Sequence, residues 1–156
     1  MKKKISFNIK EIQQSQQNKY PLLFIDKIIK CEPGKKVISI KNFTYNEWFF
    51  PAHFEDEPNV PGFIQIESMA QSFIMTFLSL KKYKNLKTNF LDLESAKFRK
   101  KIVPGDTLKI ISKLDSLEKG LATGTSEGYV EKELACSASF IVTIPEIFNK
   151  YLPKNK

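Results

Sequence analysis

The segment from Gly62 to about Leu80 constrains the fold most, because its apolar side chains cover nearly the whole circumference of a helix. The residues at helical spacing are Phe63, Ile66, Ala70, Phe73 and Phe77, and Ile64, Met69, Ile74, Met75 and Leu78 fill most of the remainder. A helix that is apolar all round is a buried helix. Its uncharged part, residues 68–80, is shorter than the roughly 20 residues that cross a bilayer. We therefore expect one buried helix, begun by Pro61-Gly62, and no membrane partner.

Strand-like patterns lie on both sides of this helix. Before it, residues 8–17 are typical of a short amphipathic helix, and Leu22–Cys31 and Val37–Phe43 predict a hairpin around the Pro33-Gly34 turn. After it, four further strands are predicted at Phe90–Arg99, Thr107–Ser116, Leu121–Val130 and Glu133–Ile144. One buried helix between two groups of strands favours an α+β fold, an antiparallel sheet wrapped around the helix. With no repeat or linker, we expect a single domain over residues 1–156.

The composition indicates a folded protein of a reducing compartment. Hydrophobic residues make up 42% of the chain, which excludes a mostly disordered protein. Two cysteines, Cys31 and Cys136, cannot form a disulfide framework, and both fall in predicted strands, where we expect buried apolar side chains. No apolar stretch of signal-peptide length precedes Lys10. We expect a cytoplasmic location.

The net charge of +8 has two interpretations. Lysines occur from Lys2 to Lys156, which is typical of a general lysine bias on a solvated surface. Alternatively, the charge attracts an acidic partner, and the densest basic patch consists of Lys97, Arg99, Lys100 and Lys101. No nucleic-acid motif or ladder of stacking aromatics accompanies this patch, so we expect no nucleic-acid partner.

Two residues could carry chemistry. His53 is the only histidine, and a lone histidine is more often structural; with the adjacent Glu55, Asp56 and Glu57 it is poor evidence for a metal site, so we expect no metal. Glu67 lies in the second turn of the apolar helix. It could belong to a narrow, solvent-exposed polar stripe of the helix, together with Gln71 on the same face. It could equally be a carboxyl group kept ready for proton transfer.

Together these groups fit one reaction class. His53 and Glu67 flank a helix N-terminus, whose first N–H groups lack helical partners and can bind a carbonyl oxygen that becomes an enolate. A base, an acid and an oxyanion site are what proton abstraction beside a carbonyl, followed by loss of water, requires. The sequence has no nucleophile motif, phosphate loop or dinucleotide fingerprint. We expect no cofactor.

The block His53-Phe54-x3-Pro58-x2-Pro61-Gly62-x4-Glu67-x3-Gln71 resembles the active-site signature of the (3R)-3-hydroxyacyl-acyl-carrier-protein dehydratases of the FabZ type. The resemblance covers about residues 8–142. It includes Tyr20-Pro-Leu-Leu-Phe-Ile-Asp26-Lys27, Glu32-Pro-Gly-Lys35, Asn46-Glu47-x-Phe49-Phe50, Ser95-Ala-Lys97-Phe98-Arg99 and Val103-Pro-Gly-Asp106.

The resemblance implies a hot-dog fold, with the long helix as the sausage and the sheet as the bun. It also implies homodimers, usually three per hexamer, with each active site taking its histidine from one subunit and its glutamate from the other. By position, His53 would remove the Cα proton, Glu67 would help protonate and orient the departing 3-hydroxyl, and the Gly62 N–H would hold the thioester carbonyl. Substrate contacts are implied for Val60, Gly62, Phe63 and Gln71, and acyl-carrier-protein docking for Lys97, Arg99, Lys100 and Lys101.

This chain departs from the family pattern in several places. Ala52 replaces the usual Gly, Glu55 a common Pro, Asn59-Val60 an apolar residue and Met, and Asn18-Lys19 the usual His-Arg. The leading hypothesis is a dehydratase of fatty acid biosynthesis. The alternatives are a dehydratase of the same chemistry in a polyketide-like or surface-glycan pathway, and a non-catalytic acyl- or carrier-binding subunit. A thioesterase is less favoured, because Glu67 occurs together with the dehydratase-type His53.

Overall fold

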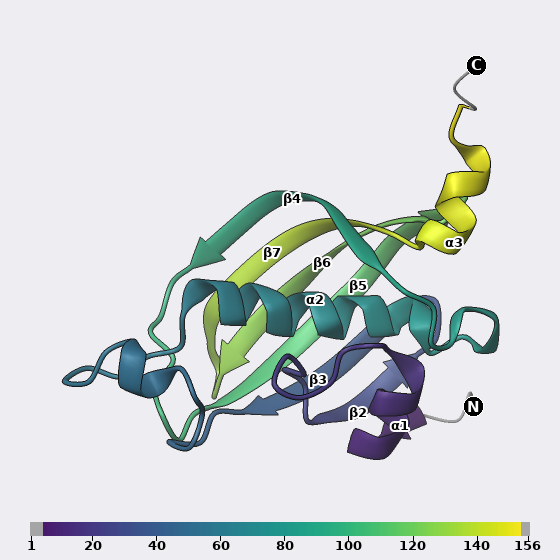
Figure 1. Ribbon diagram of the computed structural model, residues 1–156. Helices are drawn as coiled ribbons and strands as arrows, with labels where there is room; N and C mark the ends of the chain where they lie inside the picture. Colours follow the sequence, from purple (N-terminus) through teal and green to yellow (C-terminus); the bar gives the residue numbers. More distant parts are fainter. Residues whose placement is uncertain (1–4, 154–156) are drawn as a thin grey trace.

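The computed structural model describes residues 5–153, and in it one curved antiparallel sheet wraps around one long helix (Figure 1). The helix α2 (Gly62–Leu78) lies across the concave face of the sheet. This is the α+β hot-dog arrangement that the resemblance implies, and the fold expectation is confirmed. The expected single domain runs over residues 1–156, and its two ends lie outside the described residues.

The sheet has seven strands in the order β1-β2-β3-β5-β6-β7-β4, and every neighbouring pair is antiparallel. The strands are β1 (Ile5–Phe7), β2 (Lys27–Glu32), β3 (Lys36–Asn42), β4 (Asn89–Phe98), β5 (Thr107–Glu118), β6 (Leu121–Val130) and β7 (Glu133–Thr143). The other helices are α1 (Ile9–Ser15) and α3 (Pro145–Phe148), with 3-10 turns at Phe50–Ala52, Lys81–Tyr83 and Asn149–Tyr151. None of the helices in residues 5–153 is long and apolar enough to cross a membrane.

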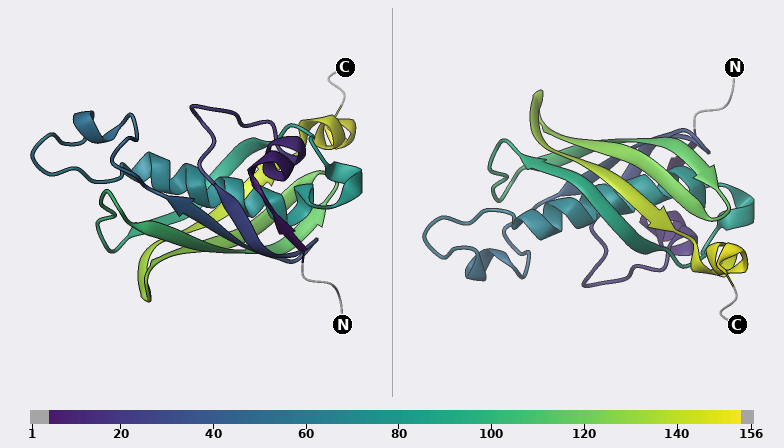
Figure 2. Two further views of the ribbon diagram at one scale, coloured as in Figure 1. Left: turned by 90° about the horizontal axis from the view of Figure 1, so that it is seen from below. Right: turned by 90° about the horizontal axis from the view of Figure 1, so that it is seen from above.

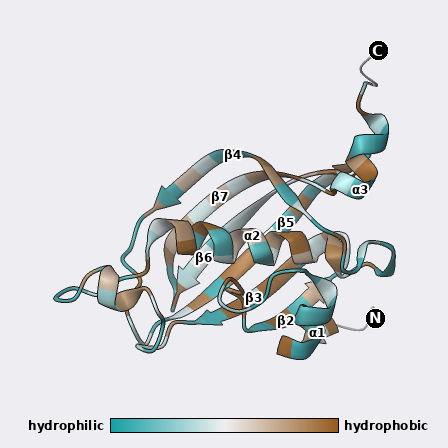
Figure 3. Cartoon of the chain, viewed as in Figure 1, coloured by the Kyte–Doolittle hydropathy of each residue, from teal (hydrophilic) through white to brown (hydrophobic). Residues whose placement is uncertain are grey.

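The burial of α2 follows from its composition. All of its residues from 68 to 78 are buried, as the all-round apolar pattern predicts (Figure 3). Phe73 stacks on Phe140 of β7 with 5.7 Å between ring centroids, and both side chains are fully buried. A Cβ atom on Gly124 of β6 would lie 2.4 Å from the Phe73 ring, so only glycine allows this strand to approach the helix so closely.

The first part of the sheet confirms one prediction and corrects another. β2 and β3 form the predicted hairpin. However, residues 22–26, predicted as the beginning of the first strand, are not in a strand. The Leu22 carbonyl accepts a hydrogen bond from the Gln71 side chain, and the Phe24 N–H donates to the same side chain, so these backbone groups pair with α2 instead of with the sheet. The sequence patterns also missed β1 and α3.

β4 occupies one edge of the sheet and pairs only with β7 among the described strands. In the right-hand view of Figure 2, seen from above, β4 crosses in front of α2. Its apolar side chains Phe90, Leu91, Leu93 and Phe98 are 37–59% exposed. A long, apolar and exposed edge strand is a template for pairing with another chain.

Candidate active site

The loop that carries His53 leaves the sheet after β3 and projects beyond it before α2 begins, at the left of Figure 1. Phe49 and Phe50 anchor the loop, since both are at most 2% exposed. The buried Lys41 of β3 provides a second anchor, because its Nζ donates a hydrogen bond to Glu47 and lies 3.7 Å from Asp26. The path of the loop is therefore fixed on the side nearest the sheet.

His53 and Asn59 bind each other within this loop. The His53 Nδ1 lies 3.0 Å from the Asn59 carbonyl oxygen, and the Asn59 N–H donates to the His53 carbonyl over 2.9 Å. Because a carbonyl can only accept, Nδ1 carries the proton, and in the neutral ring Nε2 keeps its lone pair. The ring also stacks on Phe54, with 4.4 Å between centroids. His53 thus offers a base at Nε2.

A pocket of about 360 Å³ places this imidazole beside the start of α2. Its lining includes His53, Val60, Gly62 and Phe98, and the Phe98 ring lies 3.2 Å from where a Cβ of Gly62 would be. In the described residues, the first N–H groups of α2 with backbone partners are those of Ile64 and Gln65, so the Gly62 N–H remains available. The pocket therefore offers a base and a hydrogen-bond donor for a carbonyl oxygen.

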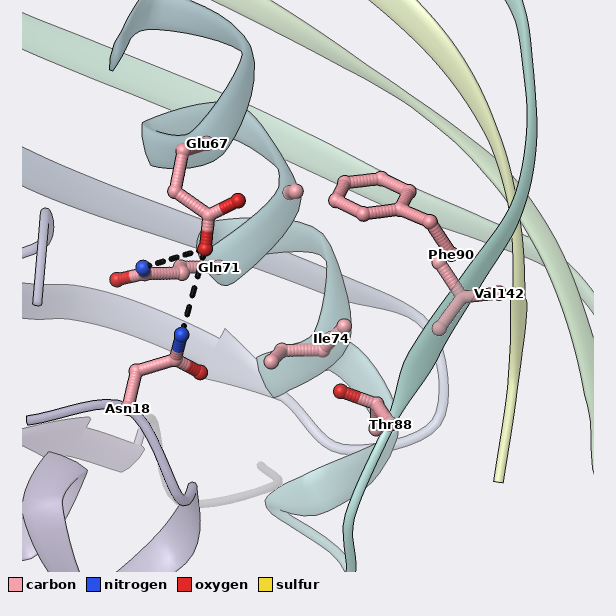
Figure 4. Close-up of a pocket in the computed structure, with 8 residues that line it drawn as sticks. Asn18, Glu67, Gln71, Ile74, Thr88, Phe90 and Val142 are labelled. Carbon is pink, nitrogen blue, oxygen red and sulfur yellow. Dashed lines mark hydrogen bonds between the residues drawn. The ribbon is translucent and has the colours of Figure 1, made fainter. Parts of the chain in front are cut away.

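Glu67 lies farther along α2, and two side-chain amides contact one of its carboxyl oxygens (Figure 4). Nε2 of Gln71 donates to Oε1 of Glu67 over 2.8 Å, and Nδ2 of Asn18 donates to the same oxygen over 3.3 Å. The prediction that Glu67 and Gln71 share a helix face is confirmed. Gln71 is 1% exposed, and its amide also bonds to Leu22 and Phe24. Both N–H groups of the Gln71 amide are therefore taken up within the chain.

Glu67 and His53 line different pockets. Glu67 lines a small pocket of about 100 Å³, which continues between α2 and β4 to Ile74 and Phe90. It also lines a mostly apolar pocket of about 390 Å³ with Leu22, Phe24, Phe63 and Ile66. Of the expected substrate contacts, Val60 and Gly62 therefore accompany His53, whereas Phe63 and Gln71 accompany Glu67.

Three of the four expected docking residues surround the His53 pocket. Arg99, Lys100 and Lys101 line it, whereas Lys97 is exposed on β4 and does not. Two of the three already have acidic partners: Lys100 lies 3.0 Å from Glu133, and Lys101 pairs with Glu57. The Glu133 carboxylate raises the pKa of Lys100. Arg99 donates only to the neutral hydroxyl of Ser137, so its charge is uncompensated by any side-chain partner in the described residues.

Sequence reasoning overlooked two polar side chains of the site. Asn18 is noted above only as a departure from the family pattern, and Gln65 is not among the predicted site residues. Gln65 is 5% exposed, lines the His53 pocket, and donates from Nε2 to the Val60 carbonyl. The polar character of position 65 in an apolar helix was the available signal. No group of three or more His, Cys, Asp or Glu residues in the described part of the chain could hold a metal ion.

Comparison with known proteins identifies the family. The FabA-like domain matches residues 17–139. A 3-hydroxyacyl-[acyl-carrier-protein] dehydratase FabZ of Clostridium novyi is 39% identical over 142 residues, covering 88% of this chain and 99% of the relative. The protein of the same name from Clostridium tetani is 40% identical over 136 residues, covering 87% and 96%.

Solved structures show the same fold at low sequence identity. The dehydratase heterocomplex ApeI:P of Xenorhabdus doucetiae superimposes with a TM-score of 0.74 at 14% identity, over 92% of this chain and 97% of that chain. A hypothetical thioesterase with coenzyme A from Streptococcus pneumoniae gives 0.60 at 15% identity, over 75% and 83%. Dehydratases and thioesterases share this fold, so the assignment depends on the sequence relatives. By the domain match and these relatives, the chain belongs to the FabA-like family, alongside the FabZ-type 3-hydroxyacyl-[acyl-carrier-protein] dehydratases.

Proposed function

We propose that this protein removes water from (3R)-3-hydroxyacyl thioesters of acyl carrier protein, giving trans-2-enoyl thioesters in fatty acid biosynthesis, with His53 as base and Glu67 as acid. The observation that carries the proposal is the pocket that His53, whose Nε2 is free, lines together with Gly62 at the N-terminus of α2. The lining of this pocket contains no serine or cysteine, so it offers neither of these nucleophiles for an acyl-enzyme. The relatives named as dehydratases, at 39% and 40% identity, favour elimination over thioester hydrolysis.

In the proposed mechanism, the thioester carbonyl binds the Gly62 N–H, which stabilises the enolate. Nε2 of His53 takes the Cα proton, and the Cα–C3 double bond forms as the C3–O bond breaks. The carboxyl proton of Glu67 passes to the departing oxygen, which leaves as water. The imidazolium proton then returns to the Glu67 carboxylate through solvent, which restores both groups.

We propose that His53 and Glu67 meet across a dimer interface. Three observations support this: the two residues line separate pockets of one chain, β4 presents an open edge, and β4 exposes apolar side chains. Pairing of the β4 edges of two copies would cover these side chains. Three such dimers would form the expected hexamer.

We also propose a cytoplasmic location. The two cysteines, Cys31 and Cys136, are free and buried, which fits a reducing compartment.

Mixing two inactive variants tests the shared site and the catalytic residues together. His53→Ala and Glu67→Gln should each reduce the hydration rate of a crotonyl thioester by about a hundredfold or more. When both variants are unfolded together and refolded, half of the dimers are mixed, and each mixed dimer has one intact site. Activity should return to about a quarter of the wild-type value. No recovery would contradict the shared site, and full activity of His53→Ala would contradict the assigned base.

We propose that the basic residues beside the His53 pocket bind the acidic carrier protein. Replacement of Arg99, Lys100 and Lys101 by Gln should raise KM for carrier-bound substrate and leave KM for a small thioester unchanged. Replacement of Lys27 of β2 and of Lys109 and Lys113 of β5 by Gln is a matched loss of three charges outside the pocket. If both triple and control variants lose affinity equally, the effect arises from net charge and the docking proposal is wrong.

Asn59-Val60 stands where the resembled family has an apolar residue and Met, which leaves the acyl group open, so a dehydratase of another pathway is the second candidate. Its chemistry is the same, and a series of acyl chain lengths distinguishes the two. A preference for straight-chain thioesters supports fatty acid biosynthesis. Carrier-protein binding without turnover of any thioester would support the non-catalytic alternative.

A further inference from the structure

The carboxyl group of Glu67 is held asymmetrically. Both amide donors that contact it, Gln71 Nε2 and Asn18 Nδ2, point to Oε1. In Figure 4 the other oxygen, Oε2, points away from both amides. No hydrogen bond involves Oε2 in the described part of the chain. The two oxygens of this carboxyl group are therefore chemically distinct before any substrate binds.

The two donors differ in how firmly they are fixed. Gln71 is buried, and its amide is fully used: Oε1 accepts from the Phe24 N–H over 2.7 Å, and Nε2 donates to Leu22 and to Glu67. Its orientation cannot reverse without loss of all three bonds. Asn18 is half-buried, and its amide makes one hydrogen bond in the described residues, the one to Glu67. Asn18 is thus the donor that can be changed without disturbing the packing of α2.

The segment that holds Asn18 is itself anchored. The Asn85 N–H donates to the Ser15 carbonyl over 2.8 Å, and the Gln17 side chain donates to the Asn85 carbonyl over 2.8 Å. The Leu22 N–H donates to the Lys19 carbonyl over 2.7 Å. These backbone contacts place Asn18 beside α2 independently of its own side chain. A substitution at position 18 therefore changes the donor and leaves its surroundings in place.

We propose that Asn18 is a positioning residue for Glu67: together with Gln71 it holds Oε1, so that Oε2 is the oxygen that gives its proton to the departing hydroxyl. An amide N–H2 group can only donate, so two such groups on Oε1 occupy its lone pairs and place the carboxyl proton on Oε2. Fixing a reacting atom in place is a large part of catalytic rate enhancement. This inference rests on the proposed dehydratase function.

Substitutions at position 18 separate the donor from its surroundings. Asn18→Leu has a similar shape without a donor, and it should lower kcat about tenfold with KM within about twofold, because the hydrogen bond that holds Oε1 is lost. Asn18→Asp should lose at least as much, since a carboxylate at position 18 can only accept and cannot hold Oε1. Asn18→His, the residue usual at this position in the resembled family, keeps an N–H donor and should stay within about threefold of the wild-type kcat.

A double-mutant cycle distinguishes positioning from a general structural effect. In the Glu67→Gln background, Asn18→Leu should cause no further loss of kcat, because the group that it positions is already absent. Gln14→Leu is the matched control, since it removes an exposed amide of the neighbouring α1 that makes no side-chain hydrogen bond in the described residues and does not touch Glu67. It should keep the wild-type kcat. A tenfold loss that persists in the Glu67→Gln background, or wild-type kcat in Asn18→Leu, would overturn the inference.

A crystal structure of Asn18→Leu provides a readout that does not depend on turnover. The carboxyl group of Glu67 should be rotated or show two orientations, with Gln71 unchanged. If the carboxyl group keeps a single orientation identical to that of the wild type, Asn18 does not position it. Absence of wild-type turnover with every thioester would instead refute the proposed function, and the crystal structure would still decide the role of Asn18.

Discussion

Four buried serines connect α2 to the middle of the sheet. The Ser39 hydroxyl donates to Ser72 over 2.8 Å, Ser112 donates to Ser72 over 2.9 Å, and Ser112 and Ser126 lie 2.7 Å apart. All four residues are fully buried. They join α2 to β3, β5 and β6, the strands on which the helix carrying Glu67 rests.

Ser72→Ala removes the acceptor that two hydroxyls share. Ser112 can turn to Ser126, but among the described residues Ser39 has no other side-chain partner and keeps a buried, unpaired hydroxyl. A buried hydrogen-bond donor without an acceptor lowers the stability of the fold by about 1–3 kcal/mol. Alanine is a better helix former than serine by roughly 0.5 kcal/mol, which offsets part of that cost. We expect the free energy of unfolding to fall by about 1–2 kcal/mol.

The double variant Ser39→Ala/Ser72→Ala should be more stable than Ser72→Ala alone, because replacing both partners of a buried hydrogen bond is nearly neutral. Ser116→Ala is the control. Its hydroxyl pairs with Thr123 over 2.8 Å, between β5 and β6, but is exposed. We therefore expect the free energy of unfolding to change by at most about 0.5 kcal/mol. Urea unfolding followed by circular dichroism, at one protein concentration because association shifts apparent stability, measures all four proteins. Additive losses in the double variant would refute the reasoning.

Three further predictions concern separate features. Gly124→Ala should destabilise the fold by about 3 kcal/mol or more in urea unfolding, because its Cβ would lie 2.2 Å from the backbone oxygen of Lys113; a stable variant would contradict this. Burial raises the pKa of Cys136 from 9.0 to about 12, so the folded chain keeps a proton that the unfolded chain loses. Stability should therefore fall as the pH rises above 9, and Cys136→Ala should reduce that slope in unfolding measured from pH 8 to 11; equal slopes would refute the assignment. Glu57→Gln removes the acidic partner of Lys101. It should lower KM for carrier-bound substrate and change the free energy of unfolding by less than about 0.5 kcal/mol. A raised KM would contradict carrier docking at Lys101.

The architecture was predictable from the amino-acid sequence alone. The all-round apolar helix and the alternating strands follow from periodicity, which depends on side chains close in the chain. The helix begins at Gly62 as predicted, and the last four strands agree with their predicted ranges to within a few residues. The buried thiols of Cys31 and Cys136 were also predictable, because both lie on inward-facing strand positions.

Residues 22–26 show where local patterns fail. Their apolar composition favours a strand, but their backbone groups pair with the Gln71 side chain, 47 positions away from Phe24. Periodicity carries no information about such a partner. β1 has only three residues, too few to establish an alternating pattern.

The functional groups of the site were predictable from the sequence, but their hydrogen bonds were not. The sequence identified His53 and Glu67 as the groups that could move protons, since a lone histidine and a carboxyl group in an apolar helix stand out by residue type alone. The folded structure was needed to show which ring nitrogen is free, because Nδ1 donates to the Asn59 carbonyl and Nε2 does not. The structure also shows that the side-chain amides of Asn18 and Gln71 both donate to Oε1 of Glu67. These hydrogen bonds require atoms from different segments to be placed to within a few tenths of an ångström. Such placement exists only after the chain has folded.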